Sequence, residues 1–479
     1  MIDNQTNIFE MLYETYKITK PIRLITLFSG YDSQALALKY LGVDYEHYKT
    51  CEWAIKSIQA LKDLHFENDN TDYSKNLTDD EVKEYLLEKG ISSNYNDPMS
   101  KEQIKRLKNH RQIYNNIQAT HNLVNIQQVK GKDLDIKDTN KYCYIMTYSF
   151  PCQDLSLAGN RKGMSDTSTR SGMLWEVERI LGELEEKPQV LLMENVIQVH
   201  GEGNKEDFNK WQLRLEKLGY KNYWQDLIAT DYGIPQTRNR CFMISILGDY
   251  NYTFPKSIPL KLKLKDMLED KVDDEYYLSE DLIKHIQKTA EEHEEYTQYD
   301  RYNGDLEMWC RVWKDKSPTL NTKRQDTKIY VKNGCKQVYD LNYYNHEQSN
   351  RVYSIDYSSP TLRTKCDEAG TIKIKNATQK GYLEASDGDG VDLAMPNSET
   401  RRGRVQKEAI QTLTTQNNLG VVSDLRIRKL TPKECFRLMG VKDEDFEKIS
   451  KNQSDSSLYH LAGDSIVVNV LMAIFKELL

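Results

Sequence analysis

Cysteine is scarce in this chain: eight occur among 479 residues, and none of them forms a Cys-x-x-Cys pair. Disulfide frameworks and structural zinc sites both need cysteines at short, regular spacing, so the sequence argues against either. The nine histidines are dispersed as well, without the spacing of a zinc site. We therefore expect no metal, and a reducing compartment such as the cytoplasm.

Long apolar runs and net positive charge are also missing. No apolar run approaches 18 residues, so no membrane-spanning helix is expected, and residues 1–14 lack the features of a secretory signal. The 66 Lys and Arg stand against 73 Asp and Glu, which gives a net charge of −7. This balance argues against a protein that covers nucleic acid non-specifically through a net positive charge. It still permits a locally basic groove, for which residues 401–407 and 426–437 are the candidates.

Strand and helix patterns alternate over the first half of the chain. Residues 22–28 form a short apolar run, followed by Ser29-Gly30 and by helical spacing over 33–41, which is how nucleotide-binding α/β units begin. Further strands are expected at 47–51, 144–150, 190–193, 224–229 and 241–246. The sequence therefore predicts an α/β domain over residues 1–250, with a doubly wound, mostly parallel sheet.

Two segments depart from this alternation. Residues 65–122 are rich in Asn, Asp, Lys and Glu, and we expect an insertion of two or three charged, solvated helices there. Short β-branched and aromatic runs predict a smaller, β-rich domain over 251–425, after which residues 426–479 return to the first domain. A helix over 465–478 is expected to close the chain.

An internal repeat lies within the β-rich region. An Arg-Val pair precedes a Thr-Leu pair three times, at residues 311–322, 351–364 and 404–415. Duplicated β-hairpins would explain the repeat by structure alone. Hairpins that present Arg and Thr side chains to a polyanion are the functional alternative.

A cysteine directly follows the strand expected at 144–150, in Pro151-Cys152-Gln153. Catalytic groups collect at the carboxyl edge of the strands in an open α/β sheet, and the polar loop 156–172 that follows could close over them. Most lone cysteines are small buried hydrophobes. An exposed Cys152 would instead be a candidate nucleophile.

A carboxyl group ends the strand at 190–193, in Glu194-Asn195. Glu194 could lie near Cys152 as a hydrogen-bond partner or proton donor, or it could merely stabilise a helix N-terminus.

Three polar residues, Gln236, Arg238 and Arg240, alternate before the strand at 241–246, so in extended chain they would share a face. Two guanidiniums on one face suit a carbonyl or phosphate oxygen, and a solvated surface strand is the alternative.

In this order the motifs resemble those of the DNA (cytosine-5)-methyltransferase family. The resemblance covers residues 22–246 and 426–479, apart from the insertion. It implies a Rossmann-like methyltransferase domain, a target-recognition domain over 251–425, and a bacterial or phage enzyme that uses S-adenosylmethionine. The matching segments are Phe28-Ser29-Gly30, Glu52-Trp53, Pro151-Cys152-Gln153, Glu194-Asn195-Val196, Gln236-x-Arg238-x-Arg240, Arg428–Gly440 and Gly463–Val470.

The resemblance also implies a mechanism. The Cys152 thiolate would attack C6 of a cytosine flipped out of double-stranded DNA, while Glu194 contacts the N3/N4 edge and supports protonation at N3. Arg240 would hold the O2 side, and Arg238 would support the loop or Cys152. C5 would then take the methyl group, lose its proton and release the thiol. Pro151, Gln153 and Asn195 belong to the same catalytic motifs.

Further roles follow from the same resemblance. For the cofactor, Phe28, Ser29 and Gly30 would hold the methionine part, Glu52 the ribose and Trp53 the adenine. Asp133 and Leu134, with Asp135 as a rival, would contact the adenine edge, and Leu174, Ser465 and Val467 would complete the pocket. The expected DNA contacts are Ser156, Gln236, Arg404 and Thr412.

The chain departs from the family pattern at two positions: Asp32 replaces a glycine of the first turn, and Asp464 replaces the asparagine of Gly-Asn-Ser. Neither change touches Cys152 or Glu194, so we expect an active enzyme. We expect a monomer that acts on double-stranded DNA. It would act either alone or in a cell that also holds a restriction endonuclease, with which it would form no stable complex. The alternatives are a tRNA cytosine-5 methyltransferase and a catalytically silent DNA-binding relative.

Overall fold

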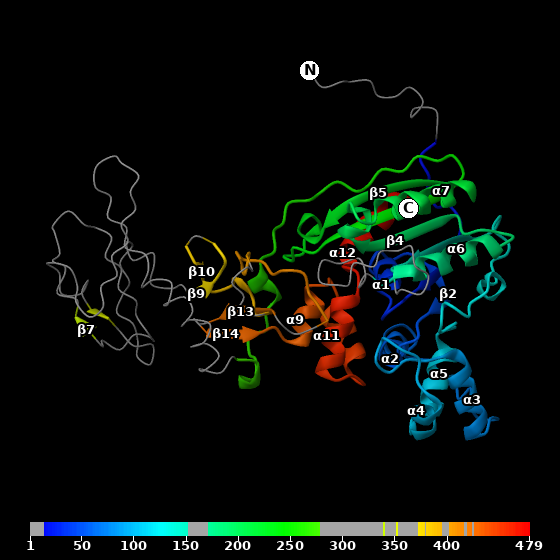
Figure 1. The fold of residues 1–479 in the computed structure, drawn as a ribbon, viewed down its shortest axis with the longest axis horizontal. Coiled ribbons are helices and arrows are strands. Elements are labelled where there is room, and N and C mark those ends of the chain that lie inside the picture. The colour runs from blue at the N-terminus through cyan, green and yellow to red at the C-terminus, as the bar shows by residue number, and fades with distance from the viewer. Residues whose placement is uncertain are drawn as a thin grey trace, which may run out of the picture.

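The computed structural model describes residues 14–151, 171–277, 339–340, 351–352, 372–378, 380–394, 402–415, 419–423 and 426–479. A six-stranded sheet of order β2-β1-β3-β4-β6-β5 forms the centre (Figure 1). Its parallel strands are β2 (Tyr45–Cys51), β1 (Ile22–Leu27), β3 (Cys143–Tyr148) and β4 (Val190–Val196); β6 (Asn239–Leu247) is antiparallel to both β4 and β5 (Tyr220–Ile228). The predicted α/β fold with a mostly parallel sheet is confirmed.

Helices cover both faces of this sheet, which explains why every residue of β3 is buried. One apolar core joins the sheet to α1 (Ser33–Tyr40) and α12 (Val468–Leu478), and a second joins it to α6 (Leu174–Glu183) and α7 (Lys205–Lys217). The chain passes from β1 to β2 on one side and later enters β3 on the other side. Ligands bind at such reversals of strand order in open α/β sheets.

The insertion contains the helices α3 (Asp79–Lys89), α4 (Lys101–Arg106) and α5 (His110–Ala119), within the expected number. Figure 1 shows them below α2 (Ile55–His65). They are more than solvated helices, because they share a small apolar core with α2. Its fully buried members include Ile58, Val82, Leu86, Ile113 and Ile117. This core attaches the insertion firmly to the sheet domain.

The described strands of the β-rich region are all antiparallel. They form the pairs β7 (Tyr339–Asp340) with β8 (Arg351–Val352) and β9 (Ile372–Lys375) with β10 (Tyr382–Ala385), and a sheet of β12 (Val405–Gln406), β11 (Gly390–Asp392), β13 (Leu419–Ser423) and β14 (Arg426–Lys429). The first two copies of the repeat lie almost entirely outside the described residues. The domain boundaries at 250 and 425 remain predictions.

The last helices are α9 (Pro432–Arg437), α10 (Asp443–Ser450), α11 (Asp455–Asp464) and α12, which starts three residues later than expected. By length and composition alone, residues 455–478 could cross a membrane, contrary to the expectation from the sequence. Burial accounts for this apolarity, because 67% of the most apolar window lies inside the fold. We therefore assign the stretch to the core.

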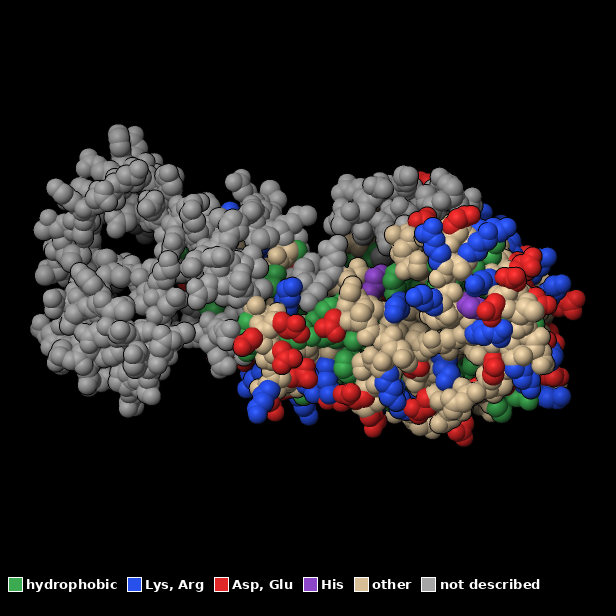
Figure 2. Space-filling view, turned by 90° about the horizontal axis from the view of Figure 1, so that it is seen from below, with side chains coloured by type: hydrophobic (Ala, Val, Ile, Leu, Met, Phe, Trp, Pro, Cys, Tyr) green, Lys and Arg blue, Asp and Glu red, His purple; other side chains and the backbone are tan. Residues whose placement is uncertain are grey.

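The basic stretch 426–437 uses part of its charge inside the molecule. The guanidinium of Arg428 forms two hydrogen bonds, of 2.7 and 2.8 Å, with the Glu434 carboxylate, and both side chains are buried. Arg437 pairs with Asp443 at 2.6 Å. On the face shown in Figure 2, acidic and basic side chains are interspersed over the described part of the molecule.

Candidate active site

A cavity of about 650 Å³ lies at the carboxyl ends of the parallel strands. This volume is typical of small-molecule sites, which span roughly 300–1,000 Å³. Many of the expected site residues line it together, although they come from distant parts of the sequence. These are Phe28, Ser29, Gly30, Glu52, Trp53, Pro151, Glu194, Asn195, Arg238, Arg240, Thr412 and Ser465.

The turn after β1 shapes one end of the cavity. Phe28, Gly30 and Asp32 all adopt left-handed backbone conformations, with φ of 58°, 57° and 63°. Only glycine does so without strain, so the other two residues must be held by their surroundings. Asp32 caps α1 by accepting a hydrogen bond from the Ala35 N–H at 3.0 Å.

The Glu52 carboxylate lies beside this turn. It accepts hydrogen bonds from the N–H groups of Gly30 (2.9 Å) and Ala54 (2.7 Å). Burial raises the pKa of Glu52 to about 7, and the nearby Asp464 carboxylate acts in the same direction. The hydrogen bonds from the two N–H groups lower this pKa and only partly offset the effect of burial. A carboxyl group held in this way can accept hydrogen bonds from the two hydroxyls of a ribose.

Glu194 and Arg240 face each other at the other end. Oε1 of Glu194 lies 3.2 Å from Nε of Arg240. Burial raises the pKa of Glu194, and the guanidiniums of Arg240 and Arg238 only partly oppose this effect. The pair therefore combines a fixed positive charge with a carboxyl group that holds its proton more tightly than usual, which suits general acid chemistry.

The chain that leads to Cys152 is fixed from the same strand as Glu194. The side-chain amide of Asn195 donates a hydrogen bond to the Phe150 carbonyl at 3.0 Å, and Pro151 lines the cavity. Cys152, Gln153 and Ser156 lie outside the described residues.

Gln236 and Arg238 hold the active-site wall together. The Gln236 side-chain amide donates to the Leu438 carbonyl (2.7 Å) and accepts from the Leu413 N–H (3.0 Å), so in this structure the buried side chain bonds to backbone groups inside the fold. Arg238 is buried too. Its guanidinium donates hydrogen bonds of 2.8–3.1 Å to the carbonyls of Leu413, Gly463 and Ser465.

A family model, the C-5 cytosine-specific DNA methylase, matches residues 90–479. The chain belongs to this family. It is a DNA cytosine-5 methyltransferase, as the resemblance of its motifs implies. The match includes the strands and helices that supply Glu194, Arg238, Arg240 and Ser465 to the cavity.

Several curated relatives of this methyltransferase are bacterial or phage enzymes. The type II methyltransferase M2.ScrFI of Lactococcus lactis subsp. cremoris is 31% identical over 95% of this chain and 99% of its own length. The orphan methyltransferase M.SssI of Spiroplasma monobiae is 32% identical over 66% of this chain and 83% of its own. The orphan methyltransferase M.SPRI of Bacillus phage SPR is 27% identical, with coverages of 69% and 81%. Among solved structures, the Dnmt2 methyltransferase of S. pombe is 15% identical, with a TM-score of 0.48 and coverages of 95% and 98%.

Some residues expected in the site of the methyltransferase are not among the residues that line the cavity. Leu134, Leu174 and Val467 are buried in the apolar cores, and the Asp133 carboxylate accepts the Lys130 N–H at 2.8 Å. Arg404 is only 2% exposed, so its side chain is buried in this structure.

Asn125, Ile126 and Gln127 line the cavity, whereas Asp133 and Leu134 do not. The preceding segment runs parallel to β2, with the Leu123 N–H bonded to the Thr50 carbonyl (2.8 Å). It therefore ends at the same sheet edge, although its sequence lacks an apolar strand pattern.

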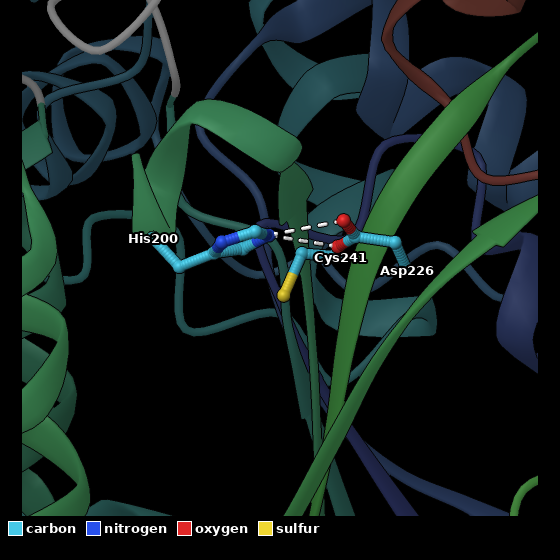
Figure 3. Close-up of side chains that lie close together, drawn as sticks. All are labelled: His200, Asp226 and Cys241. Atoms are coloured by element: carbon cyan, nitrogen blue, oxygen red, sulfur yellow. Dashed lines mark hydrogen bonds and ion pairs between the residues drawn. The ribbon is translucent and has the colours of Figure 1, made fainter. Parts of the chain in front are cut away.

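A His, an Asp and a Cys meet beside the site, although their sequence spacing gives no sign of it (Figure 3). His200 contacts the Asp226 carboxylate at 2.9 and 3.1 Å, and the ligand atoms of both residues and of Cys241 lie within 4.8 Å of one another. These are donor types that zinc accepts. Burial raises the pKa of the Cys241 thiol, and the carboxylates of Asp226 and Glu194 raise it further. The thiol therefore keeps its proton, which a metal ion would have to displace in order to bind. We assign the group to hydrogen bonding between the strands β5 and β6 and the turn that ends at His200.

Proposed function

We propose that this methyltransferase transfers a methyl group from S-adenosylmethionine to C5 of a cytosine that is flipped out of a specific double-stranded DNA sequence. The observation that supports this most is the shared cavity. It places the Glu52 carboxyl and the turn at Gly30 at one end, and the Glu194–Arg240 pair with Pro151 at the other. One cavity can thus accept a cofactor and a base side by side.

The residues at the first end fit this cofactor. The left-handed turn at Gly30 leaves space for a ligand, because nothing lies within 4 Å of where a Cβ would stand. Glu52 would hold the ribose hydroxyls, and Trp53 would cover the adenine ring. When bound, S-adenosylmethionine supplies an electrophilic methyl group.

At the second end, the Cys152 thiolate would add to C6 of the cytosine, which makes C5 nucleophilic. Glu194 would give its proton to N3 as the bond to C6 forms, and Arg240 would bind the O2 oxygen. After methylation, C5 would lose its proton to water, and the bond between sulfur and C6 would then break. This step returns the thiolate to Cys152 and the N3 proton to the Glu194 carboxylate. Asn195 would keep the chain before Cys152 in place throughout.

The remaining parts of the proposal concern the surroundings of the reaction. The β-rich region over 251–425 would read the DNA sequence, with Thr412 beside the cavity. The protein would act as a monomer in the cytoplasm, where a restriction endonuclease could act on the same sequence without a stable complex.

The test is expression of the full chain in cells that lack cytosine methylation, followed by bisulfite sequencing of their DNA. We expect protected cytosines within one or a few short sequences. Cys152→Ala should abolish protection while DNA binding persists. A folded protein that protects no cytosine would refute the proposal, and transfer by the Cys152→Ala variant would show that the nucleophile is another residue.

A further inference from the structure

One wall of the cavity comes from the charged insertion, in which none of the short motifs that carry the family resemblance lies. Tyr95, Asn96, Asp97 and Pro98 all line the cavity. They belong to the loop between α3 and α4, residues 90–100. A segment expected to lie on the outer surface therefore reaches the functional site.

The loop is fastened to the residue expected to cover the adenine. The Ser92 N–H donates to the Trp53 carbonyl at 2.8 Å, and the Ile55 N–H donates to the Ser92 carbonyl at 2.9 Å. Within the loop, Oδ1 of Asn94 accepts the N–H groups of Asn96 (2.9 Å) and Asp97 (3.0 Å). The loop is thus preformed next to Trp53.

Tyr95 occupies a strained position in this loop. Its φ is 64°, which is uncommon for any residue other than glycine and unusual for a large aromatic one. Such strained residues are concentrated at ligand sites. The Tyr95 hydroxyl is buried beside the hydroxyls of Ser57 and Ser457, with no hydrogen bond of good geometry among the described residues. Burial raises the pKa of Tyr95 to about 12, and the Glu52 carboxylate adds to this, so the hydroxyl keeps its proton.

The Tyr95 ring stacks on His460 of α11. The ring centroids are 3.7 Å apart and the planes differ by 13°. One helical turn later, Oδ2 of Asp464 lies 3.1 Å from Nδ1 of His460, close enough for an ion pair but without the alignment of a hydrogen bond. Asp464 is the residue that departs from the family's asparagine, and it too lines the cavity. The stacked pair thus connects the insertion with the C-terminal part of the chain across one side of the cavity.

We propose that Tyr95 and His460 form a wall that binds the adenosine half of the cofactor, with Asp464 holding the His460 ring in place. The adenosine half is indicated because the loop is bonded to Trp53 and lies near Glu52, whereas the methionine half is expected at Phe28 and Gly30. This inference rests on the proposed function, since it concerns the same S-adenosylmethionine site.

The experiment measures binding of the product S-adenosylhomocysteine to the full chain by calorimetry, without DNA. Tyr95→Ala and His460→Ala should each raise its Kd about tenfold or more. The double variant should lose little beyond the single ones, because the rings act as one unit. Tyr73→Ala, on an exposed side chain of the same insertion, is the matched control and should leave the Kd unchanged. Circular dichroism and melting curves identify any variant that fails to fold, and His460→Ala then carries the test.

A second ligand locates the effect. 5′-Methylthioadenosine lacks the amino acid part of the cofactor, and its binding should weaken by the same factor in Tyr95→Ala. Weaker binding of S-adenosylhomocysteine alone, or equal binding by folded wild-type and variant proteins, would overturn the proposed wall. A folded wild-type protein that binds neither ligand would instead refute the proposed function.

Discussion

Oδ2 of Asp32 lies 2.7 Å from Nε2 of His47, and both side chains are buried beside the turn that follows β1. The same carboxylate accepts the Thr26 hydroxyl (2.8 Å). Although burial opposes ionisation, the neighbouring His47 and His65 hold the pKa of Asp32 below its usual range. The aspartate that replaces the family's glycine has therefore become the centre of a buried polar network.

Asp32→Gly should reduce stability, although glycine tolerates this backbone conformation better. The variant leaves His47 and Thr26 without their shared acceptor, which we expect to cost about 2 kcal/mol after the relief of strain. Urea unfolding measures this loss. Asp32→Asn keeps the helix cap without the charge and should lose less. A glycine variant as stable as the wild type would show that the network contributes nothing.

Glu52 should make cofactor binding depend on pH. In the free protein its pKa is about 7, and hydroxyl donors from the ligand favour the carboxylate and lower that pKa. Binding then releases a proton below pH 7, so affinity for S-adenosylhomocysteine should rise roughly tenfold from pH 6 to pH 8 and then level off. The charged and titratable groups around Glu52 are Asp464, Cys51 and Tyr95. Calorimetry at several pH values tests this, and a Glu52→Gln variant with the same slope would contradict it.

The free protein should show the opposite trend in stability. The pKa of Glu52 is raised by folding from its ordinary value of 4.5, so the folded state binds this proton more tightly than the unfolded chain does. That contribution is complete below about pH 4.5 and is lost as pH rises through 7. Comparing melting temperatures of wild type and Glu52→Gln between pH 5 and pH 8 isolates it. The wild type should lose more stability than the variant, and parallel curves would contradict the assignment.

Glu194→Gln should slow methyl transfer without weakening cofactor binding. Glutamine cannot donate the proton that the raised pKa of Glu194 makes available, and general acids contribute about 10²- to 10⁴-fold. Single-turnover methylation of a DNA oligonucleotide measures the rate, with calorimetry of S-adenosylhomocysteine as the companion measurement. Glu202→Gln, an exposed neighbour, is the control. A rate within tenfold of wild type would remove Glu194 from the proton transfer.

Gly463→Ala should disturb the close packing of α11 against residues 414–415 of the third repeat copy. A Cβ at Gly463 would overlap the Thr414 backbone and lie 2.6 Å from the Thr415 nitrogen, where nothing flexible can yield. We expect a loss of about 1–3 kcal/mol in urea unfolding, together with weaker cofactor binding because Arg238 bonds to the same segments. Gly203→Ala meets nothing within 4 Å and should be neutral. Equal stability of the two variants would contradict this close approach.

The parts of the site that follow from the sequence are those at strand ends. Glu52 and Glu194 end parallel strands, and the carboxyl ends of parallel strands meet at one edge, so short motifs suffice to place them. The sheet itself is predictable for the same reason, since β1, β3 and β4 are short apolar runs between helices.

The site residues that the sequence did not predict lie in loops or depend on backbone contacts between distant parts of the chain. Tyr95 lies in a segment whose charge indicates only a solvated surface, and Asn125 follows a segment without an apolar pattern. The alternation of Gln236 and Arg238 predicts that their side chains share a face. It does not reveal that their partners are backbone groups of Leu413 and Gly463, far along the chain.

The packing of α12 against α1 has a consequence for how the protein is made. The Ile18 N–H donates to the Leu478 carbonyl at 2.7 Å, and the apolar face of α1 is covered by α12. A nascent chain therefore carries that face uncovered until residues 468–478 have left the ribosome. Contacts between such distant segments slow folding, so the core around α1 can close only after residues 468–478 have been added.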